Sequence, residues 1–302
     1  MYAVFIYFFK NFQYYFYFHQ NKIFPLNFIE DIFEKNKMYL NKVLFILIIS
    51  KMKKPYLSKI GEYHGYRVYY VNGYYIRKHL DKEFTNFGSR KYFHFIPKHE
   101  LWIDYENGKR GEARYFIDNF LMIQRELRNG QTYNEAVNIA NRHEGAERSK
   151  SKHIKKIKKI KNKKKLFKKI HIKRLFSKYT KKIKIWLVRG DLVRSIFFLD
   201  FTEGGHDKVY HFIPKNEIWI DDDVYKKEIP YVLVHELHER HLMGLGWDYD
   251  AGGVGVFSRK AKKGKKSAHF DAEKVETYCR HHPKKVKKII IDEINKNDSL
   301  ED

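Results

Sequence analysis

The sequence lacks several features that would assign the protein to a broad class. Cys279 is its only cysteine, so no disulfide can form within the chain, and a metal site must use His, Asp or Glu ligands. Both points fit a reducing compartment, and we expect a cytoplasmic protein. No run reaches the roughly 20 clean apolar residues that a membrane-spanning helix needs. General disorder is also excluded, because 43% of the 302 residues are hydrophobic and can form a core.

Residues 1–51 contain neither glycine nor arginine and are rich in Phe, Tyr, Ile, Asn and Lys. Two explanations stay open. Codons built from A and T specify these residues, so a leader before a true start at Met52 would have this composition. Alternatively, Met1–Phe18 and Val43–Ile49 form a weak membrane anchor, although polar residues interrupt the first and the second is short. We treat residues 1–51 as an N-terminal extension outside the fold.

Acidic residues are absent between Lys150 and Lys184, where 18 Lys and Arg supply most of the net charge of +25. Such a run is often a solvated linker. The alternative is a docking segment for a polyanion, either nucleic acid or an anionic membrane surface. Ile154, Ile157 and Ile160 recur at helical spacing, which favours helix in part of the run. No pattern of stacking aromatic residues accompanies it.

An internal repeat organises the rest of the chain. HFIPKHELWID at His94–Asp104 matches HFIPKNEIWID at His211–Asp221, 117 positions later. A period this long indicates a duplicated domain rather than a solenoid. We therefore expect four parts: the extension 1–51, a degenerate first copy at 52–149, a basic linker at 150–184 and a second copy at 185–302.

Each copy is predicted to be an α+β domain, with a small antiparallel sheet followed by a helix pair. In the first copy, alternation around Val71-Asn72-Gly73 indicates a hairpin, and Lys91–Ile96 and Leu101–Asp104 have strand-like patterns. Helices are expected at Ala113–Arg128 and, after the cap residue Thr132, to about residue 148. The second copy repeats this order, with strands near 185–199 and 209–220 and helices near 229–244 and 267–281.

The helix expected in Val232–Gly246 carries three histidines and two glutamates within seven residues: His235, Glu236, His238, Glu239 and His241. Residues three and four apart share a helix face, so His235, His238 and Glu239 are expected to point the same way. Two imidazoles and a carboxylate on one face can begin a metal site.

The two copies differ at the positions of these residues. His235, Glu236, His238 and Glu239 replace Asn119, Phe120, Met122 and Ile123, and His269 replaces Val137. Burying such groups without partners costs several kcal/mol each, so we expect them in a cleft or bound to each other and a metal. His206, which replaces Ser89, is a lesser candidate for the same cleft. His211 has His94 at its position in the first copy, which favours a structural role. The loop Gly252–Lys266, rich in Gly and Lys, is expected to lie over the site.

The segment VLVHELHE, which follows the edge-like strand Glu217–Asp221, resembles the active helix of zincin-type metallopeptidases. Their signature, His-Glu-x-x-His, provides two zinc ligands and a general base. His235 and Glu236 match its first two positions, but the fifth position is Glu239 instead of His. In the gluzincin branch the third ligand is a Glu on a later helix, and Glu276 matches it by position.

The sequence thus predicts a metal-dependent hydrolase, peptidase-like in its chemistry, with its site in the second copy. His235, Glu239 and His269 would hold a divalent metal, with zinc the expected ion, and Glu236 would be the general base. His238, Glu276 and His206 would be alternative ligands or would orient the ligands. Two alternatives stay open: a basic adaptor that binds nucleic acid without catalysis, and a protein whose metal is purely structural.

Overall fold

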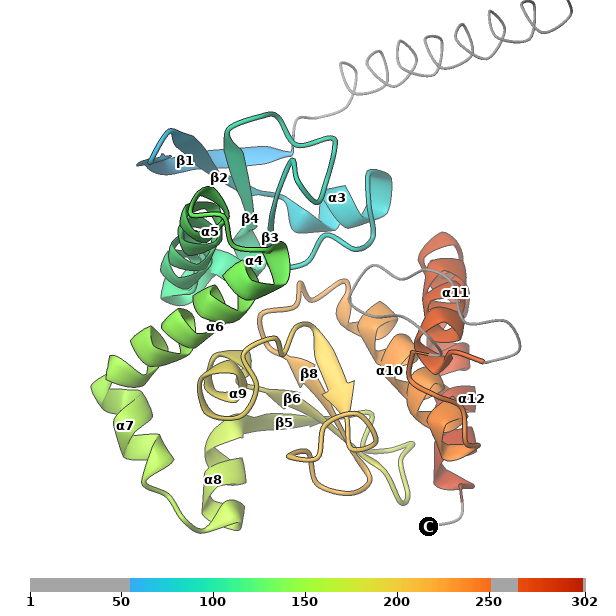
Figure 1. The fold of residues 1–302 in the computed structure, drawn as a ribbon. Helices are drawn as coiled ribbons and strands as arrows, with labels where there is room; N and C mark the ends of the chain where they lie inside the picture. The colour runs from blue at the N-terminus through green and yellow to red at the C-terminus, as the bar shows by residue number, and fades with distance from the viewer. Residues whose placement is uncertain (1–54, 251–265, 301–302) are drawn as a thin grey trace, which may run out of the picture. The chain divides into compact units, whose positions relative to one another are not determined.

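The computed structural model describes residues 55–250 and 266–300. The expectations for residues 1–51, and for nearly all of the loop Gly252–Lys266, lie outside this part. Within the described residues, no helix is both long enough and apolar enough to cross a lipid bilayer. Two four-stranded sheets, each accompanied by helices, confirm the predicted α+β class and its duplication (Figure 1).

The first copy begins with a hairpin and ends with a helix pair. Its elements are β1 (Tyr56–Tyr63), β2 (Tyr66–Val71), α3 (Gly73–His79), β3 (Phe87–Ser89), β4 (Glu100–Asp104), α4 (Tyr105–Gly108), a 3-10 turn (Lys109–Gly111), α5 (Ala113–Arg128) and α6 (Tyr133–Lys150). The predicted cap Thr132 is confirmed, because its side chain and that of Glu135 form a capping box at the start of α6.

The second copy repeats this order without counterparts of α4 and the 3-10 turn Lys109–Gly111, and it adds a helix at its end. Its elements are β5 (His171–Leu175), β6 (Lys184–Val188), α9 (Gly190–Ile196), β7 (Gly204–His206), β8 (Glu217–Asp221), α10 (Ile229–Gly244), α11 (Ala268–His281), a 3-10 turn (Pro283–Lys285) and α12 (Val286–Asp298). The sequence analysis did not predict α12. The strand orders, β1-β2-β4-β3 and β5-β6-β8-β7, are the same in both sheets. The repeat seen in the sequence is therefore also a repeat of topology.

Both sheets are mixed rather than antiparallel throughout, because the central pairs β2–β4 and β6–β8 run parallel. The hairpin expected around Asn72 is also wrong. β2 ends at Val71, and the Asn72 side chain accepts a hydrogen bond from the Tyr75 backbone N–H at the start of α3. Gly73 is needed there, because an added β-carbon would lie 1.9 Å from Asp104 Oδ2. The expected strand at 91–96 consists of turns instead.

Residues 150–184 are folded, which corrects the expectation of a basic linker. They form α7 (Lys152–Lys158), α8 (Lys163–Ile170) and β5, which is an edge strand of the second sheet. Ile154 and Ile157 of α7 are buried in the core of the second copy. The second copy therefore begins before residue 185.

Helices cover both faces of the second sheet. Ile218 and Ile220 of β8 pack with residues of α10 and α12, while Trp219 packs on the other face with residues of α7, α8 and α9. Alternate residues of a strand point to opposite faces, so one short strand contributes to both cores. The edge-like position predicted for Glu217–Asp221 is wrong, because β8 pairs with β6 and β7 and all five of its residues are buried. The edge beside α10 is formed by β7.

Two buried arginines at equivalent positions join the copies. Arg77 of α3 contacts Asp104 of its own copy at 2.7 Å and Glu228 of the second copy at 2.8 Å. Arg194 of α9 contacts the equivalent aspartate of its own copy and Glu112 of the first copy, the latter at 3.0 Å. Because Glu112 and Glu228 are themselves repeat-equivalent, the contacts between the copies are reciprocal.

Candidate metal centre

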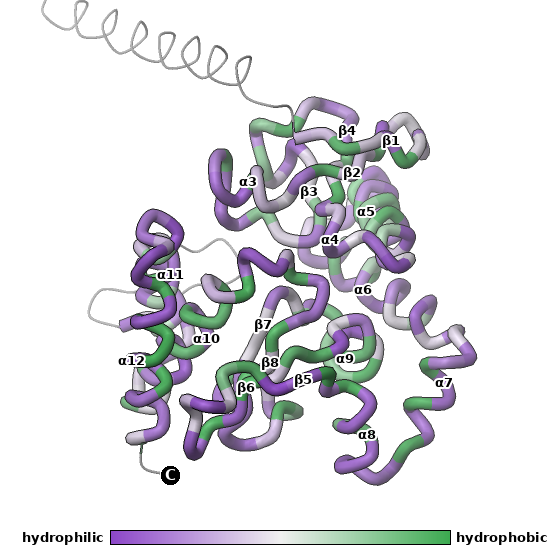
Figure 2. The backbone as a smooth tube through the Cα atoms, turned by 180° about the vertical axis from the view of Figure 1, so that it is seen from behind, coloured by the Kyte–Doolittle hydropathy of each residue, from purple (hydrophilic) through white to green (hydrophobic). Residues whose placement is uncertain are grey.

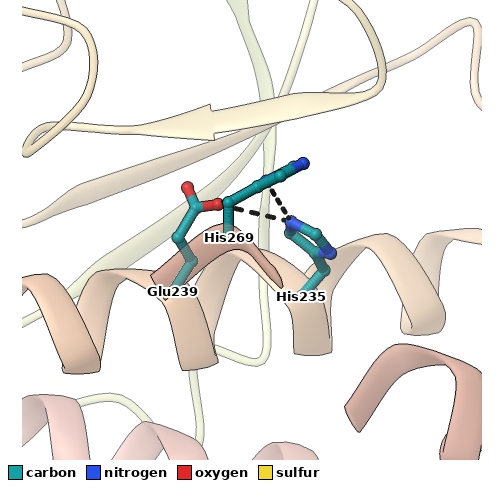
Figure 3. A group of neighbouring side chains, drawn as sticks. All are labelled: His235, Glu239 and His269. Atoms are coloured by element: carbon teal, nitrogen blue, oxygen red, sulfur yellow. Dashed lines mark hydrogen bonds and ion pairs between the residues drawn. The ribbon is translucent and has the colours of Figure 1, made fainter. Parts of the chain in front are cut away.

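Three side chains of the second copy bring ligand atoms together, as Figure 3 shows. His235 and Glu239 come from α10, and His269 comes from the first turn of α11. His269 Nδ1 lies 2.7 Å from Glu239 Oε2 and 3.1 Å from His235 Nε2. His235 Nε2 lies 3.4 Å from the same carboxylate oxygen. These are the three residues that the sequence predicts as metal ligands.

Local structure explains why these side chains meet. His235 and Glu239 are one turn apart on α10, so they share a face of the helix. The Ser267 side chain accepts a hydrogen bond from the Phe270 backbone N–H at 3.1 Å and so begins α11 just before His269. Ala268 and Ala272 are fully buried, and their small side chains let α11 pack closely on α10.

Glu276 of α11 contacts His235 on the side opposite Glu239 and His269. His235 Nδ1 lies 3.0 Å from Glu276 Oε2, so Nε2 is the nitrogen directed toward His269 and Glu239. A carboxylate on the far nitrogen is the usual partner of a metal-binding histidine, because it fixes the tautomer and the ring orientation. Glu276 therefore fixes the orientation of the His235 ring, and it is outside the group of converging atoms.

A chain of buried ion pairs continues from Glu276 to the first copy. Arg280 donates to Glu276 Oε1 and to Glu228 Oε1, each at 2.8 Å. Glu228 in turn accepts a hydrogen bond from Arg77 of the first copy. The first copy also reaches α11 directly, where Lys82 forms a 3.1 Å salt bridge with Glu273, one turn after His269. Residues of the first copy are therefore linked to the helix that carries His269 and Glu276.

His206 of β7 orients Glu239 through the other oxygen of its carboxylate, Oε1. The Lys208 backbone N–H donates to His206 Nδ1 at 3.3 Å, which leaves the ring proton on Nε2. His206 Nε2 then donates to Glu239 Oε1 at 3.0 Å. The two oxygens of Glu239 thus face different partners, His206 on one side and the two other histidines on the other. His206, Glu236 and Glu239 also form a second group of atoms within 4.8 Å of one another.

Glu236 faces the edge strand β7. A β-carbon added to Gly204 would lie 3.0 Å from Glu236 Oε1, so glycine leaves room for the carboxylate. The equivalent residues in the first copy are Phe87 and Phe120, which pack in an apolar core. Burial, and then the negative charge of Glu239, raise the pKa of Glu236 well above its usual value.

The electrostatics of the group favour positive charge at its centre. Burial alone would lower the pKa of His235, but the carboxylates of Glu239 and Glu276 hold this pKa well above its usual value. Burial would raise the pKa of Glu239, yet its hydrogen bonds to three histidines hold it well below. Burial would likewise raise the pKa of Glu276, but His235 and Arg280 bring it to about 2.

His238 does not point toward the centre, although the sequence analysis placed it on the same face as His235. Its ring lies between Asp271 of α11, at 3.3 Å, and Glu293 of α12, at 3.1 Å. No prediction was made for residues 286–298, so the partner that holds this ring was not foreseen. His211 is exposed in the turn before β8 and is not part of the converging groups.

The sequence analysis did not select Tyr249 and Tyr210, which also lie by the centre. The ring of Tyr249 is 5.1 Å from that of His269, and burial, followed by the charge of Glu239, raises its pKa. Burial and the charges of Glu236 and Glu239 raise the pKa of Tyr210. Tyr249 corresponds to Tyr133 of the first copy. Because both copies have tyrosine there, a search for residues that differ between the copies does not select it.

Comparison of the chain with protein-family models, with curated proteins and with solved structures finds no match. The function is therefore inferred from the side chains alone. Two imidazoles and one carboxylate form the ligand set of catalytic zinc sites that keep a fourth position for water or substrate.

Proposed function

We propose that the protein is a metal-dependent hydrolase whose centre is held by His235, Glu239 and His269. The observation that carries this proposal is the convergence of His235 Nε2, His269 Nδ1 and Glu239 Oε2 on one point. His269 Nδ1 has two neighbours there, but a ring nitrogen can donate only one proton. A divalent cation between the three atoms would satisfy all of their lone pairs at once.

The equivalent residues of the first copy support a functional role for this polar group. At the equivalent place, Ile123 packs with Ala136, Ala140 and the partly buried Val137 in a small apolar cluster. Ile123 and Val137 occupy the positions of Glu239 and His269. In the first copy the same fold therefore forms with an apolar contact at this place.

The surrounding residues have separate roles in the proposed reaction. A bound zinc ion would lower the pKa of a coordinated water to near 7. Glu236 accepts a proton from the attacking water, as the base of the His-Glu-x-x-His helix does in zincin-type metallopeptidases. Glu276 orients His235, and His206 orients Glu239.

Metal analysis of protein purified without a histidine tag tests the proposal. We expect close to one zinc or similar ion per chain in the wild type, and loss of this ion in His235→Ala and in His269→Ala. His94→Ala is the matched control, because His94 is exposed and lies in the first copy. Full metal retention in His235→Ala would contradict the site. Two ions per chain would instead make His206 and Glu236 ligands of a second ion and remove the assignment of Glu236 as base.

A purely structural metal remains the alternative within the same site. The two functions differ in turnover, so a screen of peptide, amide and phosphoester substrates separates them. The hydrolase requires that at least one substrate class is cleaved and that chelation of the metal abolishes the cleavage. Protein that is fully loaded with metal, loses its thermal stability on chelation and cleaves nothing would favour the structural metal.

A further inference from the structure

A concentration of positive charge lies on α7 and α8, on the far side of the second sheet from α10. Ten lysines between residues 155 and 169 are exposed, and we call them the α7–α8 lysine surface: Lys155, Lys156, Lys158, Lys159, Lys161, Lys163, Lys164, Lys165, Lys168 and Lys169. No acidic residue occurs among them in the sequence. Among residues 55–250 and 266–300, no salt bridge joins any of them to a carboxylate, and Lys158 donates to Ser149 Oγ instead.

The lysine surface is held in place by the core beneath it. Ile154 and Ile157 of α7, and Leu166 and Ile170 of α8, are buried against Trp219 and other residues of the second sheet. The Asn162 side chain accepts a hydrogen bond from the Lys165 backbone N–H at 3.0 Å and begins α8. Figure 2 shows the resulting pattern: along α7 and α8, short hydrophobic stretches interrupt a tube that is otherwise hydrophilic. A solvated linker has no such buried stripe.

Repulsion between ten uncompensated cations works against folding, so their concentration on two successive helices calls for a partner. We propose that the α7–α8 lysine surface binds the phosphate backbone of nucleic acid without reading its sequence. Clustered lysines on one face are the electrostatic footprint of such binding, and phosphate contacts by lysine carry no base specificity.

The direction of the apolar residues favours nucleic acid over a lipid surface. An interfacial helix must present an apolar face to the bilayer, with its cations on the opposite side. In α7 and α8 the apolar residues Ile154, Ile157, Leu166 and Ile170 face the protein core instead, and Phe167 is partly buried against the same cluster. Ile172, which follows α8, is exposed, but a single residue does not form a membrane-binding face.

The test measures binding of a fluorescent 25-base-pair DNA duplex and of a single-stranded RNA by anisotropy, from 50 to 200 mM salt. A variant with Lys155, Lys159, Lys164 and Lys168 changed to Gln is compared with the wild type. The control variant carries the same substitution at four exposed lysines elsewhere: Lys226, Lys227, Lys284 and Lys288. Both variants lose four charges, and Lys and Gln have similar helix propensity, so thermal melting should show equal stability.

We expect the slope of log K against log salt to fall by about 0.9 for each lysine that pairs with a phosphate of the duplex. The α7–α8 variant should bind at least about tenfold more weakly than the wild type at 100 mM salt, and the control should not. Equal weakening in both variants would overturn the proposal, because general charge would then explain binding. Tight binding to vesicles containing phosphatidylserine, with none to nucleic acid, would overturn it in favour of a membrane surface.

Discussion

In the first copy, Asn119 donates a hydrogen bond from Nδ2 to Glu144 Oε2 over 2.9 Å. His235, at the equivalent position of α10, makes the same contact with Glu276 through Nδ1 over 3.0 Å. Asn119 and His235 therefore each bond to the equivalent glutamate on one side of the side chain. They differ on the other side, where only the imidazole has a second nitrogen, Nε2, that can bind a metal.

This relationship predicts the behaviour of His235→Asn. The variant should lose the metal but keep a donor to Glu276, whereas His235→Ala loses both. An unsatisfied buried acceptor costs about 1–3 kcal/mol, so the metal-free Asn variant should be more stable than the metal-free Ala variant. Chemical denaturation in the presence of a chelator measures this difference. Equal stability of the two variants would show that the contact between His235 and Glu276 does not matter for folding.

Glu276 can be tested with a control inside the same chain. Glu276→Gln should weaken metal binding about 10- to 100-fold, because the residue that orients a ligand histidine loses its charge. Glu144→Gln changes the equivalent residue of the first copy and should leave metal affinity unchanged. Titration with zinc against a competing chelator measures both affinities. A loss of affinity in both variants would indicate a general effect on the fold rather than an effect on His235.

The grouping of His235, Glu239 and His269 could be predicted from the sequence because it depends on two local features. The spacing of His235 and Glu239 follows from the helix, and His269 is a difference between two aligned copies. The direction of His238 could not be predicted, because it depends on Glu293 in α12. The parallel pairing of β2 with β4 was also missed, since it joins strands separated by α3 and β3. In the basic run, the spacing of Ile154 and Ile157 correctly indicated helix, but not the sheet on which they are buried.

Reverting the centre to the residues of the first copy should remove the metal without weakening the fold. The triple variant His206→Ser, Glu239→Ile and His269→Val restores the residues at the positions of Ser89, Ile123 and Val137. Glu239→Ile and His269→Val replace ionic groups by apolar residues, a kind of change that is often neutral or stabilising by about 1–4 kcal/mol in a protein interior. His206→Ser introduces the residue that the first copy has at this position. We expect the triple variant to unfold at the same or a higher denaturant concentration than metal-free wild type.

The comparison must be made without metal, because a bound ion stabilises the native state of the wild type alone. A marked loss of stability in the triple variant, relative to metal-free wild type, would mean that the polar cluster is part of the folding core. The metal assignment would then lose the support that the first copy gives it.

The last prediction separates catalysis from metal binding at Glu236. This residue is on α10 beside His235, and its carboxylate lies next to Gly204 of the edge strand, outside the group of three converging atoms. Glu236→Gln keeps the size of the side chain but cannot accept a proton from water. The variant should keep its metal and its melting temperature, and it should lose at least about a hundredfold in kcat, the lower range of general-base catalysis. The substrate is the one found in the screen of peptides, amides and phosphoesters, and Glu62→Gln, an exposed change in β1, is the control. Full activity in Glu236→Gln would rule out Glu236 as the base. Loss of metal in the same variant would instead make Glu236 a ligand, and the group that it forms with His206 and Glu239 would then be the place of a second ion.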